Sequence, residues 1–228
     1  MPESAPGRAP ALPRKPRSQY HHGDLRRALL QEAVRTIAGE GPGGLTLRDV
    51  GKRLGVSRSA LYRHFSDKSA LLAAVAGDGF VRLRDDLERA WQEAGGGRRG
   101  LERMGIAYVR FAVANPSHYR VMFGDFRNLC AKDPDLQAAA AAAFDVLLQA
   151  VIALRRTALV RPDDPRLLSE FIWATVHGVA MLAIDGQLGP EPARTERLDR
   201  LLPLVLKRVR SGIDAGRSSP RAPRSPTR

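Results

Sequence analysis

The sequence predicts an all-α protein of about nine helices, in which a small three-helix unit precedes a larger helical domain. Apolar residues recur at three- and four-residue spacings through the long segments, and no segment keeps the strict alternation of a half-buried strand. Gly- and Pro-containing stretches separate these segments, and several segments begin with a Ser, Thr or Asp that can cap a helix. A hydrophobic content of 43% is sufficient for a buried core.

Charge and composition divide the chain into four predicted parts. Residues 1–19 are expected to be a disordered basic arm and 211–228 a disordered basic tail, because both are rich in Pro, Ser and Arg. Residues 20–70 form the three-helix unit and 71–210 the larger domain. Net charge is +7 over residues 1–70, zero over 71–206 and +6 over 207–228. A basic front on a neutral body indicates a polyanionic partner.

The first helix is predicted over residues 24–39, with Asp24 as its cap. Its apolar residues repeat every four positions and form one stripe, which consists of Leu25, Leu29, Ala33 and Ile37. The Gly- and Pro-rich stretch 39–44 ends the helix.

Two short helices then meet at a tight turn. Thr46 caps the first with Asp49 three residues on, Gly55 makes the turn, and Ser57 caps the second. The residues expected to face the core are Leu47, Val50, Leu54, Ala60, Leu61 and Phe65. This arrangement is typical of a helix-turn-helix, whose second helix enters the major groove of DNA.

A long helix is expected to follow to about residue 94, with Ser66 as its cap and Asp67 in its first turn. Residues 95–100 are read as a linker, and Asn115–Pro116 separates a fifth helix from a short sixth one. A loop is expected over 124–133. Asp133–Pro134 and Asp164–Pro165 each open a further helix, and a last helix over 196–210 contains Pro203, which predicts a kink or a late start.

The outward-facing residues of the helix-turn-helix have the chemistry of a DNA contact. Arg58 can donate two hydrogen bonds to guanine, and Ser59 is small enough to let the helix approach the bases. The remaining candidate contacts are expected to hold phosphates, and they are Thr46, Arg48, Ser57, Tyr62, His64 and Lys68. Lys52 and Arg53 add general attraction. Alternatively, each basic residue could be a solvated surface charge, and Tyr62 could be an aromatic packed in the core. Arg14, Lys15 and Arg17 form either an arm that contacts DNA or a solvated tail.

This stretch resembles the TetR-type (tetracycline-repressor-like) regulators. The residues that carry the resemblance over 24–72 are Thr46, Leu47, Val50, Leu54, Gly55-Val56-Ser57, Leu61-Tyr62, His64-Phe65, Lys68 and Leu71-Leu72. Trp173, His177 and Gly178 look like the W-x-x-x-H-G signature of one C-terminal subgroup, and the opening residues 20–25 are similar to it too. The resemblance implies a DNA-binding head, an all-helical body, homodimerisation and repression of an operator that is relieved by a small ligand.

The dimer interface is expected on the last two helices, where Gly178 and Ala180 would allow close approach, unless these helices only bury each other. A ligand pocket is expected among the fifth to eighth helices. Its candidate residues are Phe111, Met122, Phe123, Phe144, Trp173 and His177, with Tyr108, Phe126 and Met181 as further candidates. The alternative for these aromatics is ordinary core packing, and for His177 a hydrogen-bonded structural role.

Other classes of protein fit less well. The sequence contains no HExxH, no G-x-S-x-G, no phosphate-loop pattern and no metal-ligand spacing, so we predict neither an enzyme nor a cofactor. The main rival is an architectural DNA-binding protein without ligand control, followed by a basic protein that binds a membrane or an acidic partner. No stretch reaches about 18 uncharged apolar residues. The single Cys130, expected to be a buried hydrophobe, and the absence of a signal segment favour the cytoplasm.

Overall fold

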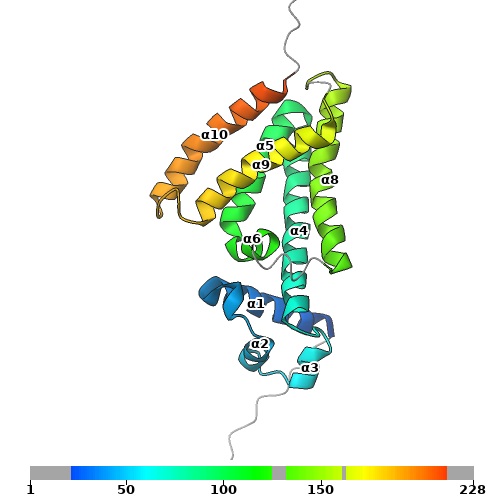
Figure 1. Cartoon of the computed structure of the whole chain (residues 1–228), viewed down its shortest axis with the longest axis vertical. Helices are drawn as coiled ribbons and strands as arrows, with labels where there is room; N and C mark the ends of the chain where they lie inside the picture. The colour runs from blue at the N-terminus through cyan, green and yellow to red at the C-terminus, as the bar shows by residue number, and fades with distance from the viewer. Residues whose placement is uncertain (1–21, 125–131, 161–162, 215–228) are drawn as a thin grey trace, which may run out of the picture.

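The computed structural model describes residues 22–124, 132–160 and 163–214, and over these residues the protein is all-helical with nine helices. The only strand-like pairing among them is an isolated bridge between Val160 and Asp214. Figure 1 shows three helices below a tall bundle, with helix α4 (Lys68–Glu93) running from the lower unit up through the bundle. The predicted arm, residues 215–228 of the predicted tail, residues 125–131 of the predicted loop with Phe126 and Cys130, and residues 161–162 lie outside the described residues. Residues 211–213, predicted as the start of a disordered tail, instead form the last turn of α10 (Ala193–Ile213), where Ile213 is buried.

The lower unit consists of α1 (His22–Gly44), α2 (Leu47–Arg53) and α3 (Arg58–Tyr62). The helix α1 begins two residues before Asp24, the predicted cap, and its regular geometry is interrupted at Gly41, close to the predicted end. The predicted stripe on α1 is buried, and it packs with Leu47, Val50, Leu61 and Phe65 from the two short helices and the segment after them. The prediction of a three-helix unit with one apolar core is therefore confirmed.

The N-terminus of α4 corrects one capping prediction. Asp67, rather than Ser66, is the cap: its carboxylate accepts the Ala70 N–H at 2.8 Å. Ser66 donates instead to the Asp67 side chain at 3.2 Å. Both residues can cap a helix, so composition alone does not decide which of two neighbours adopts the extended backbone that a cap requires.

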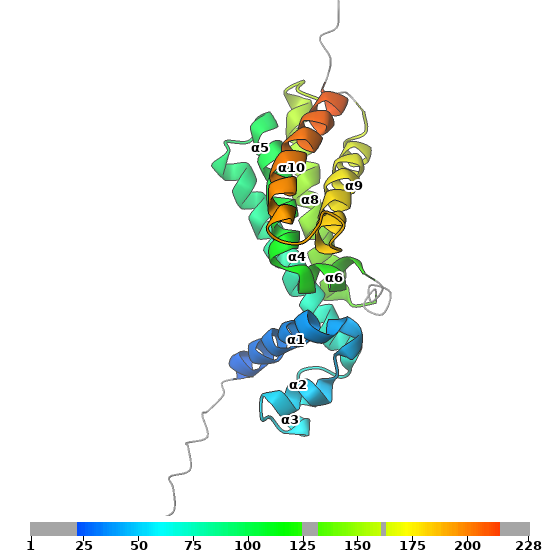
Figure 2. The ribbon, with the colours of Figure 1, turned by 90° about the vertical axis from the view of Figure 1, so that its left-hand side faces the viewer.

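The bundle above contains α5 (Gly97–Ala114), α6 (Pro116–Phe123), α8 (Pro134–Arg156), α9 (Pro165–Ile184) and α10 (Ala193–Ile213). The predicted linker 95–100 is shorter than expected, because α5 already begins at Gly97. The Asp133 and Asp164 caps are confirmed, and each carboxylate accepts a backbone N–H of its first turn. The last helix begins at Ala193 and continues through Pro203, so the late start was wrong. Figure 2 shows α9 and α10 side by side on one face of the bundle.

The helix α6 sits where the bundle meets the lower unit, and it packs against both α1 and α4 (Figure 1). The approach of α6 to α4 is close at Gly79, where an added Cβ would lie 2.5 Å from Met122 Sδ and 3.2 Å from His118 Cβ. Beside this contact, His118 Nε2 donates to the Asp78 carboxylate at 3.1 Å. That hydrogen bond, joined by Arg82, lowers the pKa of Asp78 below its usual value.

We predict that Gly79→Ala destabilises the protein, whereas Gly77→Ala in the same helix does not. Both changes gain helix propensity of about 1 kcal/mol. Only the Cβ at 79 meets neighbouring atoms, since nothing lies within 4 Å of the Cβ position at 77. Overpacking should cost about 1–3 kcal/mol. Urea unfolding measures both variants, and equal free energies of unfolding would contradict the close α4–α6 packing.

Candidate functional site: an exposed helix-turn-helix and a cavity in the bundle

The helix-turn-helix is built by two side-chain caps and a glycine. Thr46 Oγ1 accepts the Asp49 N–H at 3.1 Å and donates to the Asp49 carboxylate at 2.5 Å. Ser57 Oγ accepts the Ala60 N–H at 3.2 Å. Gly55, between the helices, has a φ of 66°, a conformation in which a side chain is strained. The turn therefore has a fixed geometry, and it presents α3 as a separate outward-facing helix.

The exposed surface of α3 carries Arg58, Ser59 and Tyr62. The Tyr62 side chain is 45% exposed, so it is not the packed core aromatic that was the alternative. The Arg58 guanidinium lies 5.4 Å from the centre of the Tyr62 ring, a distance at which a cation–π contact forms. The two side chains thus support each other on the surface. Thr46, Arg48 and Ser57 are exposed as well, and His64 is half-buried.

Arg53 has a structural role that the sequence did not indicate. Its guanidinium donates to Glu40 and to Thr36 Oγ1 at 3.0 Å, and lies 3.7 Å from Glu32, all on α1. The hydrogen bond to Glu40 raises the pKa of Arg53 further. Arg53 therefore fastens α2 to α1. Lys52 is exposed in the same helix.

Lys68 connects the start of α4 to the turn before α2. Its Nζ donates to the Gly43 carbonyl at 2.8 Å. The ammonium therefore lies beside the segment that leads into Thr46. An ammonium has three donors, so a contact with the protein and one with a phosphate are compatible.

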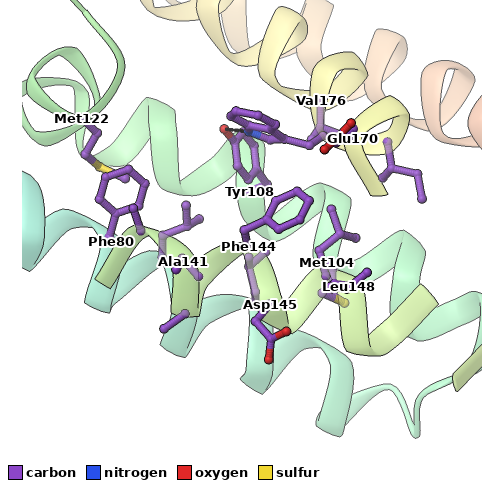
Figure 3. A pocket seen from close by; sticks show the side chains of 18 of the residues that line it. Phe80, Met104, Tyr108, Met122, Ala141, Phe144, Asp145, Leu148, Glu170 and Val176 are labelled. Carbon is purple, nitrogen blue, oxygen red and sulfur yellow. Dashed lines mark hydrogen bonds between the residues drawn. The ribbon is translucent and has the colours of Figure 1, made fainter. Parts of the chain in front are cut away.

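The bundle contains a cavity of about 870 Å³ between α4, α5, α6, α8 and α9 (Figure 3). Most of its wall is apolar, with Phe80, Leu83 and Leu87 from α4 and Met104 and Tyr108 from α5. Ala140–Ala143 on α8 contribute four of its lining residues. These small side chains belong to a run of six alanines, which leaves space beside α8. The alanine run could have indicated the cavity, but the prediction of a ligand pocket did not use it.

Four of the six predicted ligand residues line this cavity, namely Met122, Phe123, Phe144 and Trp173. Phe111 is buried on α5 but is not part of the lining, and Met181 is not part of it either. The polar lining residues Gln137, Asp145, Arg166 and Glu170 were not predicted.

His177 lies behind the cavity wall in a hydrogen-bonded cluster. Its Nδ1 is 2.6 Å from Tyr119 Oη, which is 2.9 Å from Tyr108 Oη, and Trp173 Nε1 donates to Tyr108 at 3.0 Å. Burial lowers the pKa of His177, and it raises that of Tyr108 to about 12 and that of Tyr119 further. The four groups are therefore neutral near pH 7, and Tyr108 and Trp173 are the members that also line the cavity.

An exposed, capped helix-turn-helix on a helical bundle with an internal apolar cavity defines a DNA-binding regulator. Comparison with known families agrees. Residues 29–75 match the model for bacterial regulatory proteins of the tetR family, and residues 101–205 match a tetracyclin repressor-like C-terminal domain. These matches cover both parts of the molecule, and the chain belongs to the TetR family of transcriptional regulators.

Individual relatives are consistent with this membership. The HTH-type transcriptional regulator Rv1816 of Mycobacterium tuberculosis is 28% identical, over 69% of this chain and 79% of its own length. A solved structure from Rhodococcus sp. RHA1, described as a protein with unknown function, superposes with a TM-score of 0.75 at 32% identity. The superposition covers 86% of this chain and 99% of the Rhodococcus chain. A TetR family regulator from Marinobacter aquaeolei VT8 shares the fold, with a TM-score of 0.64, 22% identity, and coverage of 83% and 95%.

Rv1816 is a transcriptional regulator, and the two matching family models describe such regulators, in agreement with the prediction that this chain is not an enzyme. By length and composition α8 and α9 could each cross a membrane, with mean hydropathies of 1.7 and 1.6. Both helices line the cavity. The cavity lining accounts for part of the apolar character of both helices, and one or two such helices are weak evidence for a membrane span.

Removing the Tyr119 hydroxyl should destabilise the bundle, because His177 and Tyr108 would each lose a hydrogen-bond partner in a buried setting. We predict that Tyr119→Phe costs about 1–3 kcal/mol. Tyr62→Phe, at an exposed position, is the matched control and should stay within about 0.5 kcal/mol. Chemical unfolding measures both, and a stability of Tyr119→Phe equal to that of the control would show that the cluster contributes nothing.

Proposed function

We propose that this protein is a dimeric cytoplasmic repressor that binds a near-palindromic operator and is released by a small molecule in the bundle cavity. The observation that carries the proposal is that one helix, α4, begins beside the helix-turn-helix and lines the cavity further along. The proposed DNA-binding domain is 20–70 and the ligand-binding and dimerisation domain 71–210. Their boundary falls in the first turn of α4, so the two domains are continuous through a rigid element.

On the operator, Arg58 and Ser59 are the proposed base contacts. The stacking of Arg58 on Tyr62 supports this role for Arg58, because a supported guanidinium loses less freedom when it binds guanine. The proposed backbone contacts are Thr46, Arg48, Ser57, Tyr62, His64 and Lys68. Thr46 and Ser57 also cap their helices, so their substitution would alter the turn as well as the contact.

The dimer is proposed to form through α9 and α10. An exposed apolar stripe runs along α9 at helical spacing, and it consists of Leu167, Phe171, Ala174, Gly178 and Leu182. On α10, Leu204 is 53% exposed. Gly178 has open space above it, which supports close approach of a second copy. Ala180, predicted beside it, is fully buried within this chain and drops out of the proposed interface.

Release by a ligand is proposed to act through α4 and α6. Both helices line the cavity, through Phe80 on α4 and Met122 and Phe123 on α6, and both pack against α1. The tight contact at Gly79 and the hydrogen bond from His118 to Asp78 join them on the side toward the helix-turn-helix. A ligand that displaces either helix would therefore shift α1 and change the separation of the two heads in a dimer.

Genomic-fragment selection followed by gel shift tests the proposal. A specific repressor enriches a short inverted repeat and binds it in a salt-dependent way as a dimer. An architectural DNA-binding protein, the remaining alternative, would enrich no such repeat and would not respond to ligands.

We predict that Arg58→Ala relaxes sequence preference, with a loss of about 1–3 kcal/mol of discrimination at one position. Lys68→Ala should weaken all sites about equally and reduce the slope of affinity against salt by about 1. Binding titrations at several salt concentrations measure both effects. Lys132→Ala, an exposed lysine at the start of the α8 segment, is the control for loss of charge. If the Arg58 and Lys68 variants behave alike, the assignment of their roles is wrong.

The proposed interface can be tested at Phe171, which is 49% exposed on the stripe. Phe171→Glu places a charge in an apolar contact and should weaken dimerisation about 30-fold or more. Val81→Glu, on α4 and 39% exposed, should leave the dimer unchanged. Analytical ultracentrifugation measures both, and a fully dimeric Phe171→Glu variant would exclude this face.

A further inference from the structure

The chemistry of the cavity restricts the class of its ligand, an inference that rests on the proposed function of the cavity. The charged residues in its lining are Asp145, Arg166 and Glu170. The side chains of Arg166 and Glu170 are 66% and 45% exposed, and Asp145 is an exposed residue. Arg166 and Glu170 therefore lie at the rim on α9, and Asp145 points away from α9 on the other side of α8 (Figure 3). The described lining residues thus place no formal charge in the interior.

Among the described lining residues, Gln137 is exposed, and the two donors that reach the interior, Trp173 Nε1 and the Tyr108 O–H, are already engaged with protein groups. Trp173 Nε1 donates to Tyr108 Oη at 3.0 Å. His177 Nδ1 lies 2.6 Å from Tyr119 Oη and 3.1 Å from Tyr108 Oη. When Nδ1 is the acceptor, every donor of the cluster has a partner, so we infer that the Tyr119 O–H donates to Nδ1. The Tyr108 O–H is then directed to Tyr119 Oη at 2.9 Å. An anionic group inside the cavity would thus find no free donor, while Tyr108 Oη keeps a lone pair that can accept from a ligand.

Among the described residues, the group behind the cavity wall that could carry a positive charge is His177. Burial lowers the pKa of His177, which keeps the imidazole neutral near pH 7. The neutral cluster extends over Tyr108, Tyr119 and His177 (Figure 3 shows Tyr108 at the wall). A carboxylate placed here would be an unpaired charge in an apolar site, which is strongly unfavourable.

The rim does not attract anions either. Arg166 Nε lies 3.1 Å from Glu170 Oε1, so its charge is offset. The same guanidinium lies 5.4 Å from the Phe144 ring, which packs edge-on against Trp173 at 6.1 Å. Arg166 is held over the aromatic edge of the opening.

The dimensions favour a long molecule. A volume of about 870 Å³ is near the upper end of the range of about 300–1,000 Å³ that ligand sites occupy. On α8 the lining runs from Leu136 to Leu148. At a helical rise of about 1.5 Å per residue, these twelve steps extend roughly 18 Å.

We propose that the cavity binds an uncharged, long-chain apolar molecule and discriminates against carboxylates of the same length. The neutral interior, the engaged donors and the Arg166–Glu170 pair at the rim together define this selectivity.

A Trp91→Phe variant provides the test, because it leaves Trp173, in the cavity wall, as the remaining one of two tryptophans. Its fluorescence is titrated with three probes of equal chain length, 1-dodecanol, dodecyltrimethylammonium and dodecanoate, below their aggregation limits. The alcohol should bind tightest and dodecanoate at least about tenfold more weakly. Tighter binding of either charged probe, or no binding of the alcohol, overturns the proposal.

A charge variant at the rim sharpens the test. Glu170→Gln frees the Arg166 guanidinium and should strengthen dodecanoate binding about fivefold, with alcohol binding unchanged. Glu88→Gln, an exposed change on α4, is the control and should alter neither. Unchanged dodecanoate binding in Glu170→Gln contradicts the role of the ion pair. Trp173 fluorescence measures which probes bind the cavity, and gel shift measures whether a bound probe releases the protein from DNA. If dodecanol binds without releasing DNA, the proposed effector role is refuted, while the proposed class of ligand still stands.

Discussion

The close packing of α4 and α6 at Gly79 is the constraint on which the rest of the molecule depends. A Cβ at position 79 would lie 2.5 Å from Met122 Sδ and 3.2 Å from His118 Cβ, so Met122 and His118 pack directly against the α4 backbone there. On one side of this contact, Phe80 and Met122 line the cavity. On the other, α6 packs against α1, which carries the core of the helix-turn-helix unit. A change in the cavity wall therefore has a short and tightly packed route to the DNA-binding end.

The bundle resolves a conflict between apolar packing and buried polar groups. Tyr108, Tyr119, His177 and Trp173 come from three helices, and their polar atoms satisfy one another. No buried side-chain polar atom among the described residues lacks a partner. Because the cluster is neutral and self-contained, it rigidifies the wall of the cavity without offering a charge to its contents.

Local rules predicted most of the fold. Thr46, Ser57, Asp133 and Asp164 cap their helices as their positions indicate, because capping depends on a few neighbouring residues. The errors arose where the outcome depends on neighbours in space. The choice of Asp67 over Ser66, and the fastening of Arg53 to Glu32 and Glu40 on α1, require the packed head.

The DNA-binding helix and the cavity of the bundle were predictable from the sequence to different degrees. The surface position of Arg58 and Ser59 follows from helical spacing, and their DNA roles remain proposals. The aromatic wall was partly predicted, but Phe111 turned out to be core and His177 to lie behind Tyr108. Sequence spacing indicates which face of a helix is apolar, and it does not indicate whether that face meets another helix or the space beside four alanines.

Coupling between the cavity and the DNA-binding head is the central claim, and thermodynamic reciprocity tests it most directly. The affinity of a cavity ligand, followed by Trp173 fluorescence, is measured with and without saturating operator DNA, and operator affinity with and without saturating ligand. The account predicts that each partner weakens the other by the same factor, about fivefold or more. Ligand affinity that is identical with and without operator would contradict it.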